Sequence, residues 1–241
     1  MTETVLVFGA SGNMGISAVI AALRSGRQVL AVVRNKANGE KIHKYAGTRE
    51  GITVAEADPT SEGSLRALVD QVRAGKLPSF QHVWASSGGI YWETPLLEIE
   101  PDALREILKV NVESYVYAYR TTVPYLLEQG FAGSTWTVCT GAQGTLGQRA
   151  GPAITQGALF SFAVAAARET ENTVVRFNEV YLAYRVQVEV DTPDFFGVPI
   201  QTSEAFSPLY QKVLDGADIK GSRVSAHGPQ DVIDLVVKKL F

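Results

Sequence analysis

Short apolar runs alternate with helical segments along most of this chain, and this alternation restricts the fold more than any other feature. Residues 5–8, 28–34 and 52–58 each read as a strand, followed in most cases by residues with helical spacing of apolar side chains. Three more strands are predicted in HVWASSGG, STWTVCTG and TVVRFNEVYL. Apolar strands that alternate with helices are typical of a parallel sheet covered on both faces. We therefore expect one doubly wound Rossmann-like α/β domain, residues 1–241, with about six strands.

Composition and charge exclude several classes of function. The formal net charge is −3 and like charges form no blocks, so the chain has no electrostatic footprint for nucleic acid or an anionic membrane. The single cysteine, Cys139, rules out an internal disulfide, and the three histidines show no metal-ligand spacing. No signal-peptide pattern or uninterrupted apolar run of about 18 residues is present. We expect a cytoplasmic protein with no metal, nucleic-acid or membrane partner.

A glycine-rich turn joins the first predicted strand to the first helix. In VLVFGASGNMGIS, glycines recur at every third residue. Glycine lets the backbone turn tightly and approach a pyrophosphate, which the free N–H groups and dipole of the helix N-terminus attract. A turn that merely packs the helix against the strand is the alternative. The residues predicted to hold the dinucleotide here are Gly9, Ser11, Gly12, Asn13, Met14 and Gly15.

Two charged residues follow the second and third strands. Arg34 stands where an acidic residue would accept a hydrogen bond from the ribose 2′-hydroxyl of NAD, and a guanidinium suits the 2′-phosphate of NADP instead. We expect NADP(H) as the cofactor; an ordinary exposed arginine is the alternative. Asp58 is placed to accept a hydrogen bond from the adenine amino group, or else it forms a turn or helix cap, as Asp-Pro sequences do.

Together these motifs resemble the short-chain dehydrogenase/reductase family, and the resemblance covers nearly the whole chain. WASSGGI stands in place of the family's Asn-Asn-Ala-Gly turn, which implies cofactor contacts for Ser86, Ser87 and Gly88. Residues 94–126 match the family's fourth and fifth helices, through which we expect a homodimer. The match places Asn111 at the catalytic asparagine of the family's helix kink.

The family's proton relay is missing from this sequence. The family's reaction is hydride transfer between a nicotinamide and a carbonyl or alcohol, with acid–base help from a Tyr-x-x-x-Lys pair and a Ser. Thr140 offers a hydroxyl at the Ser position, whereas Pro152 and Gln156 stand at the Tyr and Lys positions. The nicotinamide-contacting Pro-Gly after the sixth strand is replaced by Leu182-Ala183. Reduction of an iminium or enone, which needs less acid than a ketone, is not excluded.

Other residues are candidates for a relocated catalytic group or a substrate pocket. Tyr115 lies one turn after Asn111 on the same helical face, so it either lines the site or packs in the core. Tyr91 and Trp92 follow the fourth strand at the sheet edge where ligands bind, and ordinary loop residues are the alternative. Gln143, with Gln148 and Arg149, lies in the loop beside the vacated Tyr position.

Two expectations concern the last quarter of the chain. Residues 183–222 form a long irregular segment after the sixth strand and are predicted to be a substrate lid, with a plain surface connection as the alternative. Residues 228–241 resemble the helix that precedes the family's seventh strand, so we expect a sheet without that edge strand. The aromatic residues that favour the lid are Phe195, Phe196, Phe206 and Tyr210.

Three functions agree with these observations. The first is an atypical NADP(H)-dependent reductase of a small organic substrate whose proton donor has moved. The second is a cofactor-binding scaffold for non-redox chemistry, such as a cyclase, isomerase or pericyclase. The third is a non-catalytic NADP-binding regulatory protein. We favour the first, because an aromatic-rich segment after the sixth strand fits an enzyme better than a sensor.

Overall fold

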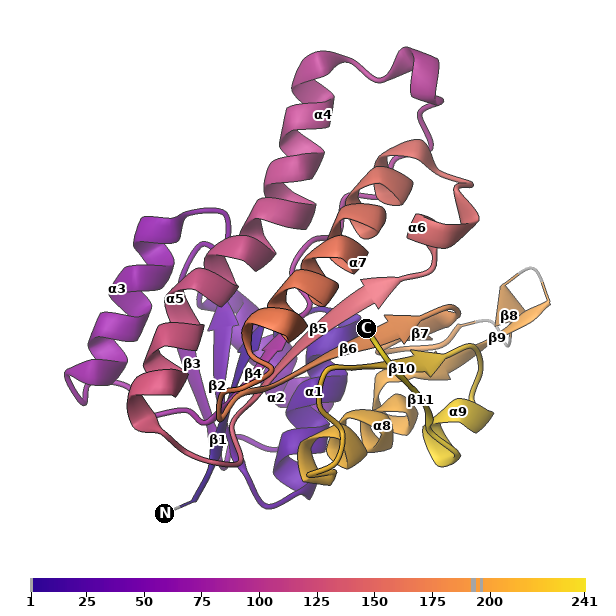
Figure 1. The fold of residues 1–241 in the computed structure, drawn as a ribbon. Coiled ribbons are helices and arrows are strands. Elements are labelled where there is room, and N and C mark those ends of the chain that lie inside the picture. The colour runs from indigo at the N-terminus through magenta and orange to yellow at the C-terminus, as the bar shows by residue number, and fades with distance from the viewer. Residues whose placement is uncertain (1, 192–193, 196) are drawn as a thin grey trace.

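A parallel sheet with helices on both faces forms the body of the molecule (Figure 1). The computed structural model describes residues 2–191, 194–195 and 197–241. The strands of the main sheet are β1 (Thr4–Phe8), β2 (Gln28–Val33), β3 (Ile52–Glu56), β4 (His82–Ala85), β5 (Thr135–Gly141), β6 (Arg176–Leu182), β10 (Ser222–Ala226) and β11 (Val236–Lys239). The helices are α1 (Asn13–Arg24), α2 (Ala37–Ala46), α3 (Glu62–Arg73), α4 (Pro101–Leu108), α5 (Ser114–Gln129), α6 (Gln143–Leu146), α7 (Ala150–Glu169), α8 (Ser203–Asp215) and α9 (Gln230–Ile233).

The order of the strands confirms the doubly wound Rossmann-like fold. The sheet runs β11-β10-β6-β5-β4-β1-β2-β3, and each pair except β10–β11 is parallel. The strand order changes direction between β1 and β4, which is the topological switch point at which ligands bind in such sheets. The turn after β1 and the loop after β4 therefore meet at one edge.

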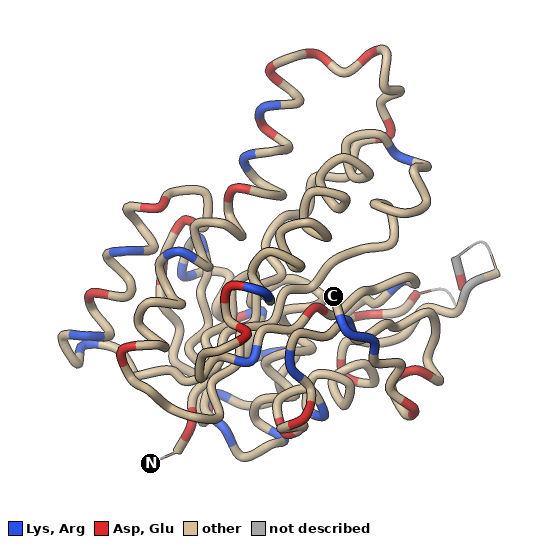
Figure 2. The backbone as a smooth tube through the Cα atoms, viewed as in Figure 1, with Lys and Arg blue, Asp and Glu red and all other residues tan. Residues whose placement is uncertain are grey.

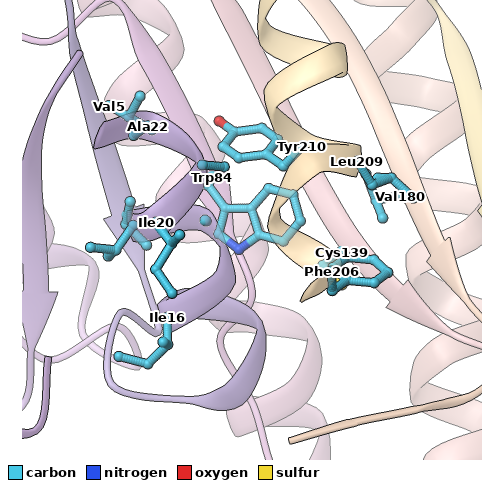
Figure 3. Close-up of a cluster of buried hydrophobic side chains, with 14 of the residues drawn as sticks. Val5, Ile16, Ile20, Ala22, Trp84, Cys139, Val180, Phe206, Leu209 and Tyr210 are labelled. Atoms are coloured by element: carbon cyan, nitrogen blue, oxygen red, sulfur yellow. The ribbon is translucent and has the colours of Figure 1, made fainter. Parts of the chain in front are cut away.

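Two apolar cores fill the space between the sheet and its helices. One lies under α1 and α8, where Trp84 of β4 packs against Tyr210 of α8 with ring centroids 4.4 Å apart (Figure 3). The other lies under α3, α5 and α7, where Trp136 of β5 stacks on Phe177 of β6 with centroids 5.4 Å apart. The strands are apolar on both faces because both faces are covered, which is the pattern that the sequence shows.

The expectation of a six-stranded sheet without the family's seventh strand was wrong. β10 pairs with β6 in parallel, and β11 then adds an antiparallel strand at the edge. β10 has the sequence SRVSA, in which buried and half-buried positions alternate, so it lacks the continuous apolar run by which the central strands were recognised. The C-terminal helix is only the short α9, because the β-branched pair Val236–Val237 extends into β11.

The predicted lid separates into two parts. The helix α8 belongs to the core, since Phe206 and Tyr210 are fully buried against α1 and the sheet. The lid prediction was wrong for this half, because an amphipathic helix buries its apolar face wherever it can cover a sheet. The other half forms a small sheet of β7 (Arg185–Gln187), β9 (Val198–Thr202) and β8 (Asp194–Phe195). Phe196 lies outside the described residues, and the side chain of Phe195 is not described.

The helix α7 is long and apolar enough to cross a membrane by length and composition. Its charged residues, Arg168 and Glu169, stand only at its carboxyl end, as the uncharged length of the helix in Figure 2 shows. In this fold it packs on β5 and β6, and side chains such as Leu159 and Ala163 are fully buried there. A core helix of a globular protein has the same properties.

Candidate functional site

The turn between β1 and α1 has the geometry of a phosphate cradle. Gly9 has φ +73°, and a Cβ there would lie 2.5 Å from the carbonyl oxygen of Ser86. A Cβ on Gly15 would lie 2.0 Å from the carbonyl oxygen of Gly9. Gly12 is the N-cap of α1 and has no side chain to cap the helix, so its first N–H groups have no side-chain cap among the described residues. The glycines let the turn pack closely against the loop after β4 and against itself, and the uncapped N-terminus of α1 fits a pyrophosphate group.

The remaining residues of the turn lie on its open side. Ser11 and Met14 are half-buried and Asn13 is exposed. The Asn13 Oδ1 atom accepts a hydrogen bond of 3.2 Å from the backbone N–H of Val188, one residue after β7. The segment after β6 therefore contacts the phosphate turn directly, which the sequence did not indicate.

Arg34 and Asp58 lie close together at the ends of β2 and β3. Arg34 is exposed. The Oδ1 atom of Asp58 accepts hydrogen bonds from the backbone N–H (2.9 Å) and hydroxyl (2.8 Å) of Thr60. The backbone bond from Thr60 is the main cause that lowers the pKa of Asp58, and the nearby charges of Lys109 and Arg34 lower it further. Asp58 thus forms the turn that was the alternative reading, while it stays exposed beside Arg34.

The loop after β4 is attached to the long helical segment by two side chains. The Tyr115 hydroxyl donates a hydrogen bond to the carbonyl oxygen of Ser87. The Asn111 Nδ2 group donates to the carbonyl oxygen of Ile90 at 2.9 Å, and its Oδ1 accepts from the N–H of Ile90 at 3.4 Å. Gly88 has φ +115°, and a Cβ there would lie 3.0 Å from Asn111 Oδ1. Only glycine fits this approach of loop and helix.

Ser86 and Ser87, two predicted cofactor residues of this loop, differ in whether their hydroxyl groups have a hydrogen-bond partner. Ser86 is half-buried and its hydroxyl donates to the carbonyl oxygen of Phe8, 3.3 Å away. The Ser87 hydroxyl is buried without a partner among the described residues. A buried polar atom without a protein partner is uncommon, and a bound ligand is one way to satisfy it.

Asn111 owes its position to a break between two helices. A π-helical turn, Lys109–Glu113, separates α4 from α5. Such single turns insert an extra residue and are frequent at functional sites. The expected helix kink at Asn111 is therefore present, and its side chain is buried and used to hold the loop after β4.

Thr140 is not available to a substrate in this structure. It is buried, and its hydroxyl donates to the Oε1 atom of Glu179 at 2.6 Å. Glu179 is fully buried on β6, and its other oxygen accepts from the Nε group of Arg223 at 2.7 Å. Burial raises the pKa of Glu179, while the bonds from Arg223 and Thr140 oppose this. The acidic residue inside TVVRFNEVYL was the sequence signal for this cluster.

The two residues that the family pattern places at its Tyr and Lys positions, Pro152 and Gln156, are both buried on α7. Gln156 is buried on α7, and its Oε1 accepts a 2.6 Å hydrogen bond from the backbone N–H of Gly141 at the end of β5. A Cβ on Gly141 would lie 3.6 Å from that oxygen, so Gly141 faces the Lys position. Pro152 is buried in the first turn of α7. Gln143 accepts a bond from the N–H of Arg149 and so holds the loop before α7.

The predicted pocket residues Tyr91 and Trp92 lie between the π-helical turn and the start of α7. Trp92 is half-buried near Gly151, where a Cβ would lie 3.8 Å from its ring. Tyr91 is 52% exposed. Arg149 forms an ion pair of 2.7 Å with Glu93, which joins this loop to α7.

Cys139 takes no part in this arrangement. Burial raises the pKa of the Cys139 thiol to about 12, so it is not a nucleophile at neutral pH. Within the described ranges, no three His, Cys, Asp or Glu side chains are grouped so that they could hold a metal ion.

Comparison with known proteins agrees with the fold. A family model described as short chain dehydrogenase matches residues 3–192. The short-chain dehydrogenase/reductase iacG of Pestalotiopsis fici is 45% identical over 237 residues, which cover 98% of this chain and 95% of that protein. The chain belongs to the short-chain dehydrogenase/reductase family. A more distant relative is 3beta-hydroxysteroid dehydrogenase 2 of Eggerthella lenta, which is 25% identical over 54% of this chain and 50% of its own.

Solved structures of this family share the fold at low sequence identity. A short-chain dehydrogenase/reductase from Mycobacterium marinum superimposes with a TM-score of 0.78 at 19% identity and covers 92% of both chains. ElxO with NADP bound gives a TM-score of 0.79 at 15% identity and covers 93% of this chain and 97% of its own. These likenesses concern the fold alone.

Proposed function

We propose that this chain binds NADP(H) and reduces an activated C=O, C=N or C=C bond of a small organic molecule. The observation that carries the proposal is the phosphate cradle, in which Gly9 and Gly15 leave no room for a side chain and α1 has no side-chain cap. The residues that would hold the cofactor are those of the turn, with Ser87 contributing its unpartnered hydroxyl. The cofactor would supply the hydride.

Arg34 supports NADP(H) over NAD(H). It follows β2, it is exposed, and its charge acts on Asp58 at the neighbouring strand end. A guanidinium in this place pairs with a phosphate and gives the two ribose hydroxyls of NAD no acceptor. The structural relative ElxO carries NADP on the same fold.

The class of substrate follows from which hydroxyl groups already donate hydrogen bonds within the protein. Thr140 and Tyr115 are two of the three residues predicted as catalytic. Their hydroxyl groups donate hydrogen bonds to Glu179 and to the backbone carbonyl of Ser87, respectively. An electrophile that accepts hydride without a strong proton donor, such as an activated carbonyl or an iminium, therefore fits this site best. Tyr91 and Trp92 offer it an aromatic surface.

A fluorescence titration with NADPH and NADH tests the cofactor. We expect the wild-type protein to prefer NADPH, and Arg34→Ala to weaken NADPH by about 1.5–3 kcal/mol, roughly ten- to a hundredfold, without change for NADH. Arg49→Ala, which removes an exposed arginine paired with Glu40, is the matched control and should leave both affinities unchanged. If neither cofactor binds, the glycine turn is inherited architecture and the proposal fails.

A cofactor-binding scaffold for non-redox chemistry is the second candidate. It is favoured by Pro152 and Gln156, which stand where the family has its proton relay. Consumption of one NADPH per product supports a reductase, whereas product formation without NADPH oxidation supports a cyclase or isomerase. Tight NADPH binding without any turnover would support a regulatory protein.

Assembly and location are proposals as well. A homodimer through residues 94–126, which contain α4 and α5, follows the family pattern and is checked by light scattering. The exposed residues of α4 include charged ones, among them Asp102 and Arg105, so such an interface would contain ion pairs at its rim. We place the protein in the cytoplasm.

A further inference from the structure

The tyrosine side chains at the carboxyl edge of the sheet differ in burial and in whether their hydroxyl groups have a hydrogen-bond partner. Tyr115 donates to Ser87, and Tyr184 donates to the side chain of Gln201. Tyr181 is buried, with its ring 5.8 Å from that of Phe160. Tyr91 is exposed over about half of its surface (52%), and its hydroxyl has no hydrogen-bond partner among the described residues.

The backbone on both sides of Tyr91 is anchored. Ile90 is bonded twice to the Asn111 side chain in the π-helical turn. On the other side, Trp92 packs near Gly151, and Glu93 is paired with Arg149 at 2.7 Å. Tyr91 is thus held in a short span between the family's asparagine position and the start of α7, next to the vacated Tyr position.

The pKa of the Tyr91 phenol departs from its ordinary value although the residue is half exposed. Burial raises its pKa, and so does an electrostatic interaction with Cys139. Tyr91 in turn contributes to the raised pKa of Tyr115. The contacts of Ile90 and Trp92 place Tyr91 beside Asn111 and the start of α7, and the raised pKa keeps its phenol protonated at neutral pH.

We propose that Tyr91 is the proton donor of this active site, in a role that rests on the proposed NADPH-dependent reduction. The electrophilic carbon of the substrate gains a hydride, with its electron pair, from the reduced nicotinamide. The π electrons of the C=O or C=N bond move to the heteroatom, which takes the proton of the Tyr91 hydroxyl. The substrate is reduced, NADPH is oxidised to NADP⁺, and a proton from water restores the phenol.

This assignment accounts for the missing lysine. A buried phenol needs a relay to recover its proton, but a half-exposed one exchanges it with solvent. No lysine occurs between Lys109 and Lys212, so an ammonium from that part of the chain does not assist.

The first test compares Tyr91→Phe with the wild-type protein on NADPH and three activated carbonyl compounds: isatin, phenylglyoxal and ethyl benzoylformate. We expect kcat to fall by about a hundredfold or more, while the Kd for NADPH and the melting temperature stay unchanged. Tyr117→Phe removes an exposed phenol bonded to Glu113 and is the matched control, with wild-type kcat. A Tyr91→Phe enzyme within threefold of wild type overturns the assignment.

The second test does not depend on turnover. Nitration of Tyr91 by tetranitromethane, followed by peptide mass mapping, should be slowed by NADP⁺ together with isatin, while nitration of Tyr117 should not. If the protein binds NADPH but Tyr91 is not protected, the donor assignment fails and the cofactor proposal stands. If the protein binds NADPH but oxidises none with any of the three compounds, the reductase proposal and the donor assignment fall together.

Discussion

The side-chain oxygen of Gln156 accepts a hydrogen bond from the backbone N–H of Gly141, and the two atoms are 2.6 Å apart. This bond joins α7 to the end of β5 at the residue that the family pattern places at its lysine position. Gln156 therefore acts in this structure as a hydrogen-bond acceptor at the sheet edge, whereas a lysine there would only donate.

Restoring the family's pair should not restore its activity. In Pro152→Tyr/Gln156→Lys, an ammonium, which only donates, would replace the acceptor of the Gly141 N–H group. We expect the double variant to be destabilised by about 1–3 kcal/mol and to leave a simple ketone such as cyclohexanone unreduced, since Leu182-Ala183 also replace the Pro-Gly that contacts the nicotinamide. Denaturant unfolding and NADPH oxidation check both parts. Ready turnover of cyclohexanone would falsify this view.

A methyl group on Gly15 should destroy the phosphate cradle. The added Cβ would lie 2.0 Å from the carbonyl oxygen of Gly9, so the turn must move. We expect Gly15→Ala to lose about 1–3 kcal/mol of stability and more than about tenfold in NADPH affinity. Gly63→Ala, in the first turn of α3 with no atom near the new Cβ, is the matched control and should be neutral or slightly stabilising. Equal behaviour of the two variants would contradict the cradle.

Removal of the Asn111 side chain should loosen the loop that carries Tyr91. Asn111→Ala leaves the N–H and carbonyl groups of Ile90 without their partner, which costs about 1–3 kcal/mol in the free energy of unfolding. We also expect faster nitration of Tyr91. Asn172→Ala, at an exposed position, should change neither quantity. Urea unfolding and peptide mapping measure them, and an unchanged stability would show that the loop is held elsewhere.

Stability should fall in mild acid because of His82. It is buried at the start of β4 between Thr135 (3.0 Å) and Glu3 (2.9 Å), and burial lowers its pKa to about 4. The unfolded chain binds a proton below pH 6.5 and the folded chain does not, so stability is full above pH 6.5 and is lost as the pH falls towards 4. Between pH 7 and 5 the loss is roughly 2 kcal/mol. His82→Gln should flatten this slope in urea unfolding. An unchanged slope would assign it to other groups.

Part of this architecture can be predicted from the sequence alone. The alternation of apolar strands with helices determines a doubly wound sheet, and the glycine turn predicts a dinucleotide site, because local periodicity and glycine spacing are properties of neighbouring residues. The absence of Tyr and Lys from Gly151–Glu169 is equally a fact of sequence. Asn111 was located in the same way, from its place in the family pattern.

Only the tertiary structure decided which of these side chains remain free. β10 escaped recognition because its short, alternating sequence becomes a strand only beside β6. The sequence shows that Thr140 has a hydroxyl group, but only the structure shows that this group is buried and donates a hydrogen bond to Glu179. Tyr115 and Tyr91 are the same residue type near the same site, yet one is bonded to Ser87 and the other has no partner among the described residues. Hydrogen-bond partners and burial depend on segments far apart in the chain, and local sequence carries no record of them.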